Sequence, residues 1–211
     1  MRPPVNIAVL IYPGVELVDM NGPIDVFSHA NRFKPSPYNI YTVAADAGNV
    51  TSEAKIVTIV PQYTIANCPT PDIVVIPGIV NDDNSTGIAA PAIISWIKEM
   101  VERKTIILSV CIGIYNLAAT GLLSGKKVTT HYLAIDDFHQ QYKNVTIIKN
   151  VRFVEDGDIV TTGGVTSGID GALHLVEKYD GPSLAQHVAD ILVYNRDAPL
   201  PPYTILPPYY S

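Results

Sequence analysis

The chain has 211 residues, of which 47% are hydrophobic and only 16% charged, and its formal net charge is −6. This balance argues against a nucleic-acid-binding surface, because contact with phosphates needs clustered lysine and arginine, and the sequence has no such cluster. The first apolar run ends at Pro13 and is too short for a signal sequence or a membrane span. We therefore expect a compact cytoplasmic protein that contacts neither nucleic acid nor membrane.

The first half of the chain alternates between strand-like and helix-like patterns. Strands are predicted at residues 5–11, 38–44 and 73–76, and the apolar continuity of the last suggests burial on both faces. One helix is predicted to open at Asn21, with Pro23 at an early helical position, and another to cover residues 91–103. Residues 53–60 alternate in polarity and predict a short β-hairpin arm.

The second half continues this alternation. Strands are predicted at residues 105–110, 128–130, 145–148, 151–153 and 159–162, the last after a Glu-Asp-Gly-Asp hairpin turn. Helices are predicted after Cys111 up to Gly121, around Ile135 and Phe138, and over residues 165–179 and 182–194. Residues 198–211 are too rich in proline for a helix and predict an extended strap or a frayed end.

This order of elements predicts a single α/β domain over residues 1–197, built on a doubly wound, mostly parallel sheet with helices on both faces. In such sheets ligands bind outside the C-terminal ends of the strands. Asp19, Gly78 and Cys111 each follow a predicted strand, so they can converge at that edge.

Cys111 lies where a β-rich run stops and a helix-like stretch begins, between the small residues Ser109 and Gly113. A nucleophile at such a turn adopts a strained backbone and needs small neighbours two residues away on each side. The first helical N–H groups then point at the sulfur and favour the thiolate. The alternative is an inert buried cysteine, since free cysteine often packs as a small hydrophobe.

The remaining sequence signals favour no metal and no cofactor. Cys68 lacks a comparable turn and is expected to be structural, and a reducing compartment would keep both thiols free. The His and Cys residues lack the spacing of metal ligands. The glycines of residues 163–168 lack the order of a dinucleotide-binding fingerprint.

Seven short motifs, in order along nearly the whole chain, together resemble the ThiJ/PfpI superfamily, and specifically its isonitrile hydratase-like branch. They are Pro-Gly at 13–14, Val-Asp-Met-Asn-Gly-Pro at 18–23, Val-Ile-Pro-Gly at 75–78, Ser-Val-Cys-Ile-Gly at 109–113, Gly-Leu-Leu-Ser-Gly-Lys at 121–126, Thr-Thr-His at 129–131 and Gly-Gly-Val-Thr-Ser-Gly-Ile-Asp at 163–170. The resemblance implies a flavodoxin-like fold of the class I glutamine amidotransferase type, and a homodimer.

The resemblance further implies that Cys111 is the nucleophile and that Asp19 is its acidic partner. A carboxylic acid kept protonated by burial can donate a hydrogen bond to a thiolate and later release its proton. Two alternatives stay open for Asp19. It could be a helix cap before Pro23, and Glu16 is a nearby rival for the acidic role.

Backbone N–H groups near Gly78 and Ile79 and at Ile112 are expected to bind developing negative charge. The resembling hydratases carry Thr directly after the nucleophile and a second Gly after Pro-Gly, where this chain has Ile112 and Ile79. The backbone N–H survives both changes, but the Thr hydroxyl is lost. His131 resembles the family histidine near the site, and the alternative for it is a polar residue at a helix start.

We therefore expect a small electrophile as the ligand, with Cys111-dependent hydration of isonitriles to N-substituted formamides, a lyase-type reaction without cofactor. Ile112 is expected to impair or redirect that activity. A non-catalytic ligand-sensing or redox-sensing domain is the first alternative. Glyoxalase-like activity on reactive carbonyls is the second. The sequence after the last predicted helix has no helix-turn-helix pattern, so direct DNA binding is not expected.

Overall fold

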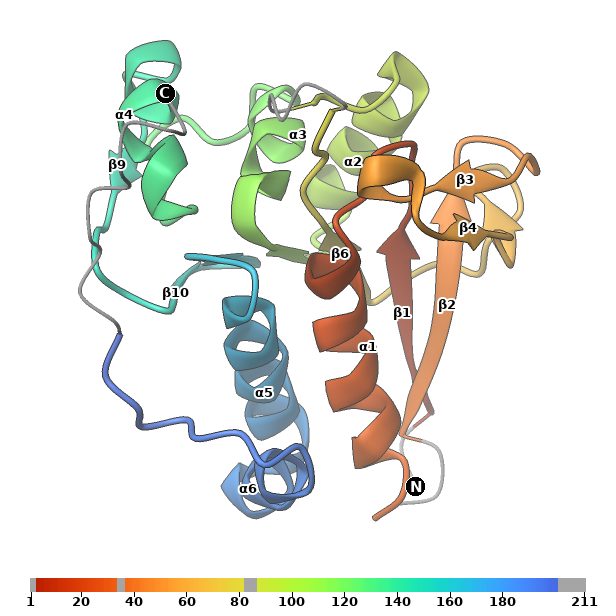
Figure 1. Ribbon diagram of the computed structural model, residues 1–211, viewed down its shortest axis with the longest axis vertical. Helices are drawn as coiled ribbons and strands as arrows, with labels where there is room; N and C mark the ends of the chain where they lie inside the picture. Colours follow the sequence, from red (N-terminus) through yellow and green to blue (C-terminus); the bar gives the residue numbers. More distant parts are fainter. Residues whose placement is uncertain (1–2, 34–36, 82–86, 201–211) are drawn as a thin grey trace.

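One central sheet of seven strands organises the molecule (Figure 1). The computed structural model describes residues 3–33, 37–81 and 87–200. Across the sheet the strands are β10 (Phe153–Asp156), β11 (Ile159–Thr162), β7 (Ile106–Ser109), β6 (Ile73–Ile76), β1 (Val5–Leu10), β2 (Tyr38–Ala44) and β5 (Tyr63–Thr64). The pair β10–β11 is antiparallel and the other pairs are parallel. The predicted doubly wound α/β architecture is confirmed.

Six α-helices accompany the sheet within the described residues: α1 (Leu17–Ala30), α2 (Pro91–Glu102), α3 (Ile114–Ala118), α4 (Ile135–Gln141), α5 (Ser167–Asp180) and α6 (Pro182–Ile191). The chain moves across the sheet in one direction from β1 to β2 and in the other from β6 to β7. Right-handed crossovers therefore place α1 and α2 on opposite faces. Helices α1, α5 and α6 pack together, as Figure 1 shows, while α2 contacts α3.

The core follows from the apolar strand runs. All four residues of β6 are buried, as are nearly all those of β1 and β7, as expected for parallel strands covered on both faces. Helix α2 buries Ile93, Trp96, Ile97 and Met100, which repeat at the i, i+3, i+4, i+7 spacing of one helix face. These contacts fix the ends of β6 and β7, from which the site is built.

Helix α1 begins four residues earlier than the sequence predicts. It starts at Leu17 rather than Asn21, because the Glu16 side chain accepts a hydrogen bond from the Asp19 N–H and caps the helix. Pro23 consequently lies inside the helix and not at its first turn. The shift places Asp19 in the first turn of α1, with its side chain buried.

The predicted hairpin arm is confirmed, although it starts three residues earlier. It consists of β3 (Val50–Thr51) paired antiparallel with β4 (Thr58–Ile59), around the 3-10 turn Glu53–Lys55. Strands β8 (Lys127–Val128) and β9 (Thr146–Ile147) form a separate parallel pair. Strand β5 is missing from the sequence prediction because two residues are too few to carry a polarity pattern.

The last predicted helix ends at Ile191 rather than residue 194. Beyond it, Tyr194 and Ala198 are held by Arg152, which donates hydrogen bonds to the Tyr194 hydroxyl at 2.8 Å and the Ala198 carbonyl at 2.7 Å. Most of the predicted proline-rich tail, residues 201–211, lies outside the described residues. Among the helices that are described, none is both long and apolar enough to cross a membrane.

Candidate active site

Cys111 occupies a strained turn between β7 and α3. Its φ is +57°, a left-handed conformation that costs a non-glycine residue about 1–3 kcal/mol. A Cβ atom at Gly113 would lie only 2.1 Å from the Ile76 carbonyl oxygen and 2.7 Å from that of Pro77. Only glycine therefore lets the chain after Cys111 pass the end of β6. The backbone geometry matches the predicted elbow.

Cys111 is buried, with 6% of its surface exposed. Burial raises the pKa of its thiol well above 9.0, and the backbone N–H of Ile112 offsets part of that rise. The structure thus favours the thiol, whereas the sequence predicted a thiolate. The reason is that only a short 3-10 turn (Cys111–Gly113) and the five-residue α3 follow the cysteine, so their N–H groups do not offset the loss of water.

Asp19 is fully buried beside this thiol. Burial raises the pKa of its carboxyl well above 3.8, and the nearby charge of Glu16 raises it further. The Gly78 N–H donates a hydrogen bond to Oδ2 at 2.8 Å, while Oδ1 has no hydrogen-bond partner among the described residues. We infer a neutral carboxylic acid with its proton on Oδ1, because an unpaired carboxylate is costly to bury.

The side chains of Glu16 and Asp19 play different roles at the start of α1. The Glu16 side chain accepts from the Asp19 N–H at 2.5 Å, and Glu53 of the hairpin arm accepts from the Leu17 N–H at 3.0 Å. Both glutamates thus satisfy free donors at the start of α1. The alternative that Asp19 is the helix cap is wrong, because Glu16 occupies the capping position.

The three backbone groups expected to bind negative charge are differently placed. The Gly78 N–H is engaged by Asp19, and a Cβ atom at Gly78 would lie 2.6 Å from Ile112 Cγ1 and 2.9 Å from Asp19 Oδ2. Gly78 therefore makes room for the carboxyl. The Ile112 N–H interacts with the sulfur of Cys111. The Ile79 side chain is buried and lines a second cavity.

Thr130 and His131 reach the elbow from the loop after β8. The Thr130 hydroxyl donates a hydrogen bond to the Cys111 carbonyl at 2.9 Å and so helps to hold the strained peptide. His131 is half-buried, lines the same cavity as Cys111, and its ring lies 4.6 Å from that of Tyr132. Burial lowers the pKa of His131, which favours neutral imidazole near neutral pH.

A cavity of about 470 Å³ opens onto the thiol. Its lining combines apolar and acidic side chains: Glu16, Val80, Cys111, Ile112, Tyr115, His131, Leu133, Ala134, Asp137 and Val165. Tyr115 and Asp137 are missing from the sequence prediction, and the Tyr115 hydroxyl donates to Asp137 Oδ2 at 2.5 Å. Tyr115 lies four residues after Cys111, one helical turn on, which is the signal that could have identified it.

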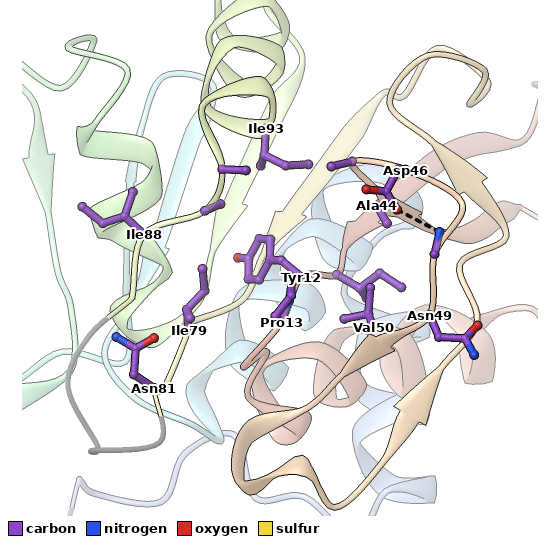
Figure 2. A pocket seen from close by; sticks show the side chains of 15 residues that line it. Tyr12, Pro13, Ala44, Asp46, Asn49, Val50, Ile79, Asn81, Ile88 and Ile93 are labelled. Carbon is purple, nitrogen blue, oxygen red and sulfur yellow. Dashed lines mark hydrogen bonds between the residues drawn. The ribbon is translucent and has the colours of Figure 1, made fainter.

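A second cavity, of about 380 Å³, lies between the loop after β1, the segment after β2 and the start of α2 (Figure 2). Figure 2 shows Tyr12 near its centre, with Ile79 and Val50 close by. The Tyr12 hydroxyl donates to the Pro77 carbonyl and accepts from Asn116 Nδ2 at 3.2 Å. The described lining of this cavity includes no cysteine and combines apolar side chains with Asp46, Asn49 and Asn81.

Within residues 3–33, 37–81 and 87–200, no group of three or more His, Cys, Asp or Glu side chains is placed to hold a metal ion. Cys68 and Cys111 are both free thiols. The cavity can therefore supply a thiol and a neutral imidazole, and the Asp19 carboxyl is buried beside the thiol without lining the cavity. These groups suit addition of sulfur and a proton to a small electrophile.

Comparison with known proteins gives these residues a context. The isonitrile hydratase of Pseudomonas putida is 31% identical over 94% of this chain and 81% of its own length. The HTH-type transcriptional regulator CdhR of Pseudomonas aeruginosa is 26% identical over 90% of this chain, which spans only 55% of that regulator. The relatives thus include an enzyme and parts of regulators.

Solved structures agree on the fold. A ThiJ/PfpI family protein from Pseudomonas syringae superimposes with a TM-score of 0.77 at 29% identity, covering 94% of this chain and 78% of that one. DJ-1beta of Drosophila melanogaster gives 0.76 at 21% identity, covering 92% and 100%. The model of the DJ-1/PfpI family matches residues 5–178. This chain belongs to the DJ-1/PfpI family.

Proposed function

We propose that this protein hydrates isonitriles to N-substituted formamides, with Cys111 as the nucleophile and Asp19 as the acid. The observation that carries the proposal is the pairing of a strained cysteine, φ +57°, with a fully buried carboxyl that interacts with its side chain. The similarity to an isonitrile hydratase over 94% of the chain supports the choice of reaction. A small electrophile is the expected ligand.

In the proposed first step, Cys111 sulfur forms a bond with the terminal carbon of R–N≡C. Asp19 delivers its proton to that same carbon, and the thiol proton replaces it on the carboxyl. The product is a thioimidate, R–N=CH–S–Cys111, with Asp19 again neutral. A carboxyl with a raised pKa suits this role, because it holds its proton at neutral pH until the carbon accepts it.

In the second step, water adds to the thioimidate carbon. One water proton goes to nitrogen, the carbon–sulfur bond breaks, and the other proton returns to Cys111. This releases R–NH–CHO and the free thiol. Neutral His131, which shares the cavity, is the available group for accepting a proton from the water.

The test is turnover of cyclohexyl isocyanide, followed by formamide absorbance. We expect wild type and Cys68→Ser to be active, and Cys111→Ser to lose activity by at least about a thousandfold, as is usual for a covalent nucleophile. Intact protein without turnover would count against the hydratase. Mass spectrometry of quenched reactions should trap the thioimidate on Cys111 alone.

Ile112 defines a second experiment. It is half-buried and lines the cavity, where the resembling hydratases carry a threonine hydroxyl. We expect Ile112→Thr to raise turnover, because the new hydroxyl can hold the attacking water. If neither wild type nor Ile112→Thr turns over isonitriles, the sensing role described below is favoured.

The second candidate is a ligand-sensing or redox-sensing role. The raised pKa of Cys111, caused first by burial, disfavours an attacking thiolate and so favours a non-catalytic role, and the regulators among the relatives add weight. Peroxide titration with mass spectrometry separates the two. Ready sulfinate formation at Cys111, without turnover of isonitriles or of methylglyoxal, supports sensing.

We further propose that the protein works as a homodimer in a reducing compartment such as the cytoplasm. Ile56, Val57 and Val60 on the hairpin arm are 73%, 38% and 70% exposed, and Val18 of α1 is 40% exposed. Apolar side chains gathered on one arm suit burial against a second copy. Light scattering should report a dimer, and Ile56→Lys should weaken it.

A further inference from the structure

The charged groups of the Cys111 cavity are all of one sign. Its described lining includes the carboxylates of Glu16 and Asp137 and no lysine or arginine. The remaining titratable groups there do not offset them, because burial lowers the pKa of His131 and so favours its neutral form. A negative charge entering this cavity thus meets carboxylates and no described cation.

Asp137 is an exposed residue of the cavity lining and is positioned by two hydrogen bonds. The buried Tyr115 hydroxyl donates to its Oδ2 at 2.5 Å, and Gln141 Nε2 donates to the same oxygen at 2.8 Å. Burial, followed by the hydrogen bond to Asp137, raises the pKa of Tyr115 and keeps its hydroxyl protonated as a donor. Leu133, 57% exposed, adds an apolar surface to the same lining.

We propose that this cavity selects uncharged or cationic electrophiles with an apolar substituent and disfavours those that carry a carboxylate, with Asp137 as the selecting residue. The inference names the substrate class of the proposed hydratase and rests on that function for its choice of isonitriles. It applies equally to any electrophile that reaches Cys111, because Coulomb repulsion acts before the chemical step.

The expected size of the effect is modest. Asp137 is exposed, so water and salt screen its charge, and one such charge changes relative rates by about twofold to fivefold. Asn at position 137 has nearly the same shape and can still accept a hydrogen bond from Tyr115. Asp137→Asn therefore removes the charge with little change in packing.

The test compares two alkylating reagents that differ mainly in charge, neutral iodoacetamide and anionic iodoacetate. The rate constants at Cys111 are measured by peptide mass spectrometry, and their ratio is divided by the ratio for a small free thiol. We expect a neutral-over-anion preference in wild type that falls about twofold to fivefold in Asp137→Asn. Asp136→Asn, whose side chain is 91% exposed next door, is the matched control and should keep the wild-type ratio.

The same proteins are then assayed with butyl isocyanide, isocyanoacetate and a trimethylammonium-bearing alkyl isonitrile. Asp137→Asn should raise relative kcat/KM for isocyanoacetate and lower it for the cation. Alkylation ratios that respond while no isonitrile turns over would refute the hydratase and leave charge selection standing. If isonitriles turn over but wild type and Asp137→Asn show the same neutral-over-anion preference, charge selection by Asp137 is wrong and the hydratase function stands. If Asp137→Asn fails to fold, wild type alone provides the test: added salt must lower its neutral-over-anion preference in alkylation.

Discussion

Asp19 and Asp170 are both buried aspartates in the first turn of a helix, yet their surroundings differ completely. Asp170 receives hydrogen bonds from Arg152 at 3.0 Å and from the Tyr194 hydroxyl at 2.7 Å. Asp19 receives one from the Gly78 N–H, and its other carboxyl oxygen is without a described partner. The Asp170 carboxyl thus has a cation and a hydroxyl as partners, whereas the Asp19 carboxyl has a backbone N–H.

The difference lies in what offsets the cost of burial at each carboxyl. Burial raises the pKa of both groups, and at Asp170 the hydrogen bonds from Tyr194 and Arg152 offset part of that rise. At Asp19 the next influence after burial is the charge of Glu16, which raises the pKa further. Burying a carboxyl without a neighbouring cation lowers the stability of a protein, and buried groups of this kind are typical of functional sites.

The largest expected effect tests Asp19 by substitution. Asp19→Asn keeps an acceptor for the Gly78 N–H but has no carboxyl proton to give, so isonitrile turnover should fall by about a hundredfold to ten-thousandfold. At about pH 3, below the unfolded pKa of the carboxyl, the free energy of unfolding should change by no more than about 1 kcal/mol. Steady-state kinetics and urea denaturation measure the two.

Asp25→Asn, at an exposed position of the same helix, is the control and should leave both quantities unchanged. Full activity of Asp19→Asn would remove the acid role and return Glu16 to consideration.

Asp170→Asn should give the reverse pattern. It leaves Arg152 without its carboxylate, and breaking a buried ion pair typically costs about 3 kcal/mol in the free energy of unfolding. Turnover per folded molecule should stay near wild type, because no described hydrogen bond or ion pair links Asp170 to Cys111. Asp190→Asn, at an exposed site on α6, serves as the surface control. A loss of activity without a loss of stability would contradict the assignment.

The third prediction concerns pH. A carboxyl whose pKa is raised on folding binds its proton more tightly in the native state, so it stabilises the fold below its unfolded pKa. For Asp19 that contribution is lost as pH rises above 3.8 toward the raised native value. Wild type should therefore lose stability relative to Asp19→Asn, by at most about 1.4 kcal/mol per pH unit. Parallel pH profiles for the two proteins would disprove a neutral Asp19.

The smallest effect is expected at Tyr194, a hydrogen-bond partner of Asp170. Tyr194→Phe removes a hydroxyl that donates to Asp170 and accepts from Arg152, and should lower the unfolding free energy by about 1 kcal/mol. Tyr63→Phe, on a 37% exposed ring, should cost less than about 0.5 kcal/mol. Thermal denaturation of both variants compares their stabilities. An equal loss of stability in Tyr194→Phe and Tyr63→Phe would mean that the hydrogen bonds around Asp170 do not stabilise the fold.

Sequence reasoning reached the elbow because its requirements are local. The β-rich run before Cys111 and the small Gly113 after it are visible without a structure, and Asp19 came from a motif. It missed Asp137 and Tyr115, because whether a helical side chain points into a cavity depends on how its helix packs. It also predicted a thiolate, because the helix dipole can be inferred from sequence whereas the depth of burial cannot.

The amino-acid sequence by itself determined the order of strands and helices, the glycine at position 113 and the family, since polarity patterns and steric limits act over a few residues. Only the tertiary structure decided that Glu16 caps α1, that Asp19 is buried beside Cys111, and that Asp137 lines the cavity of Cys111. The physical reason is that protonation and charge depend on water exclusion and on neighbours brought together from distant parts of the chain.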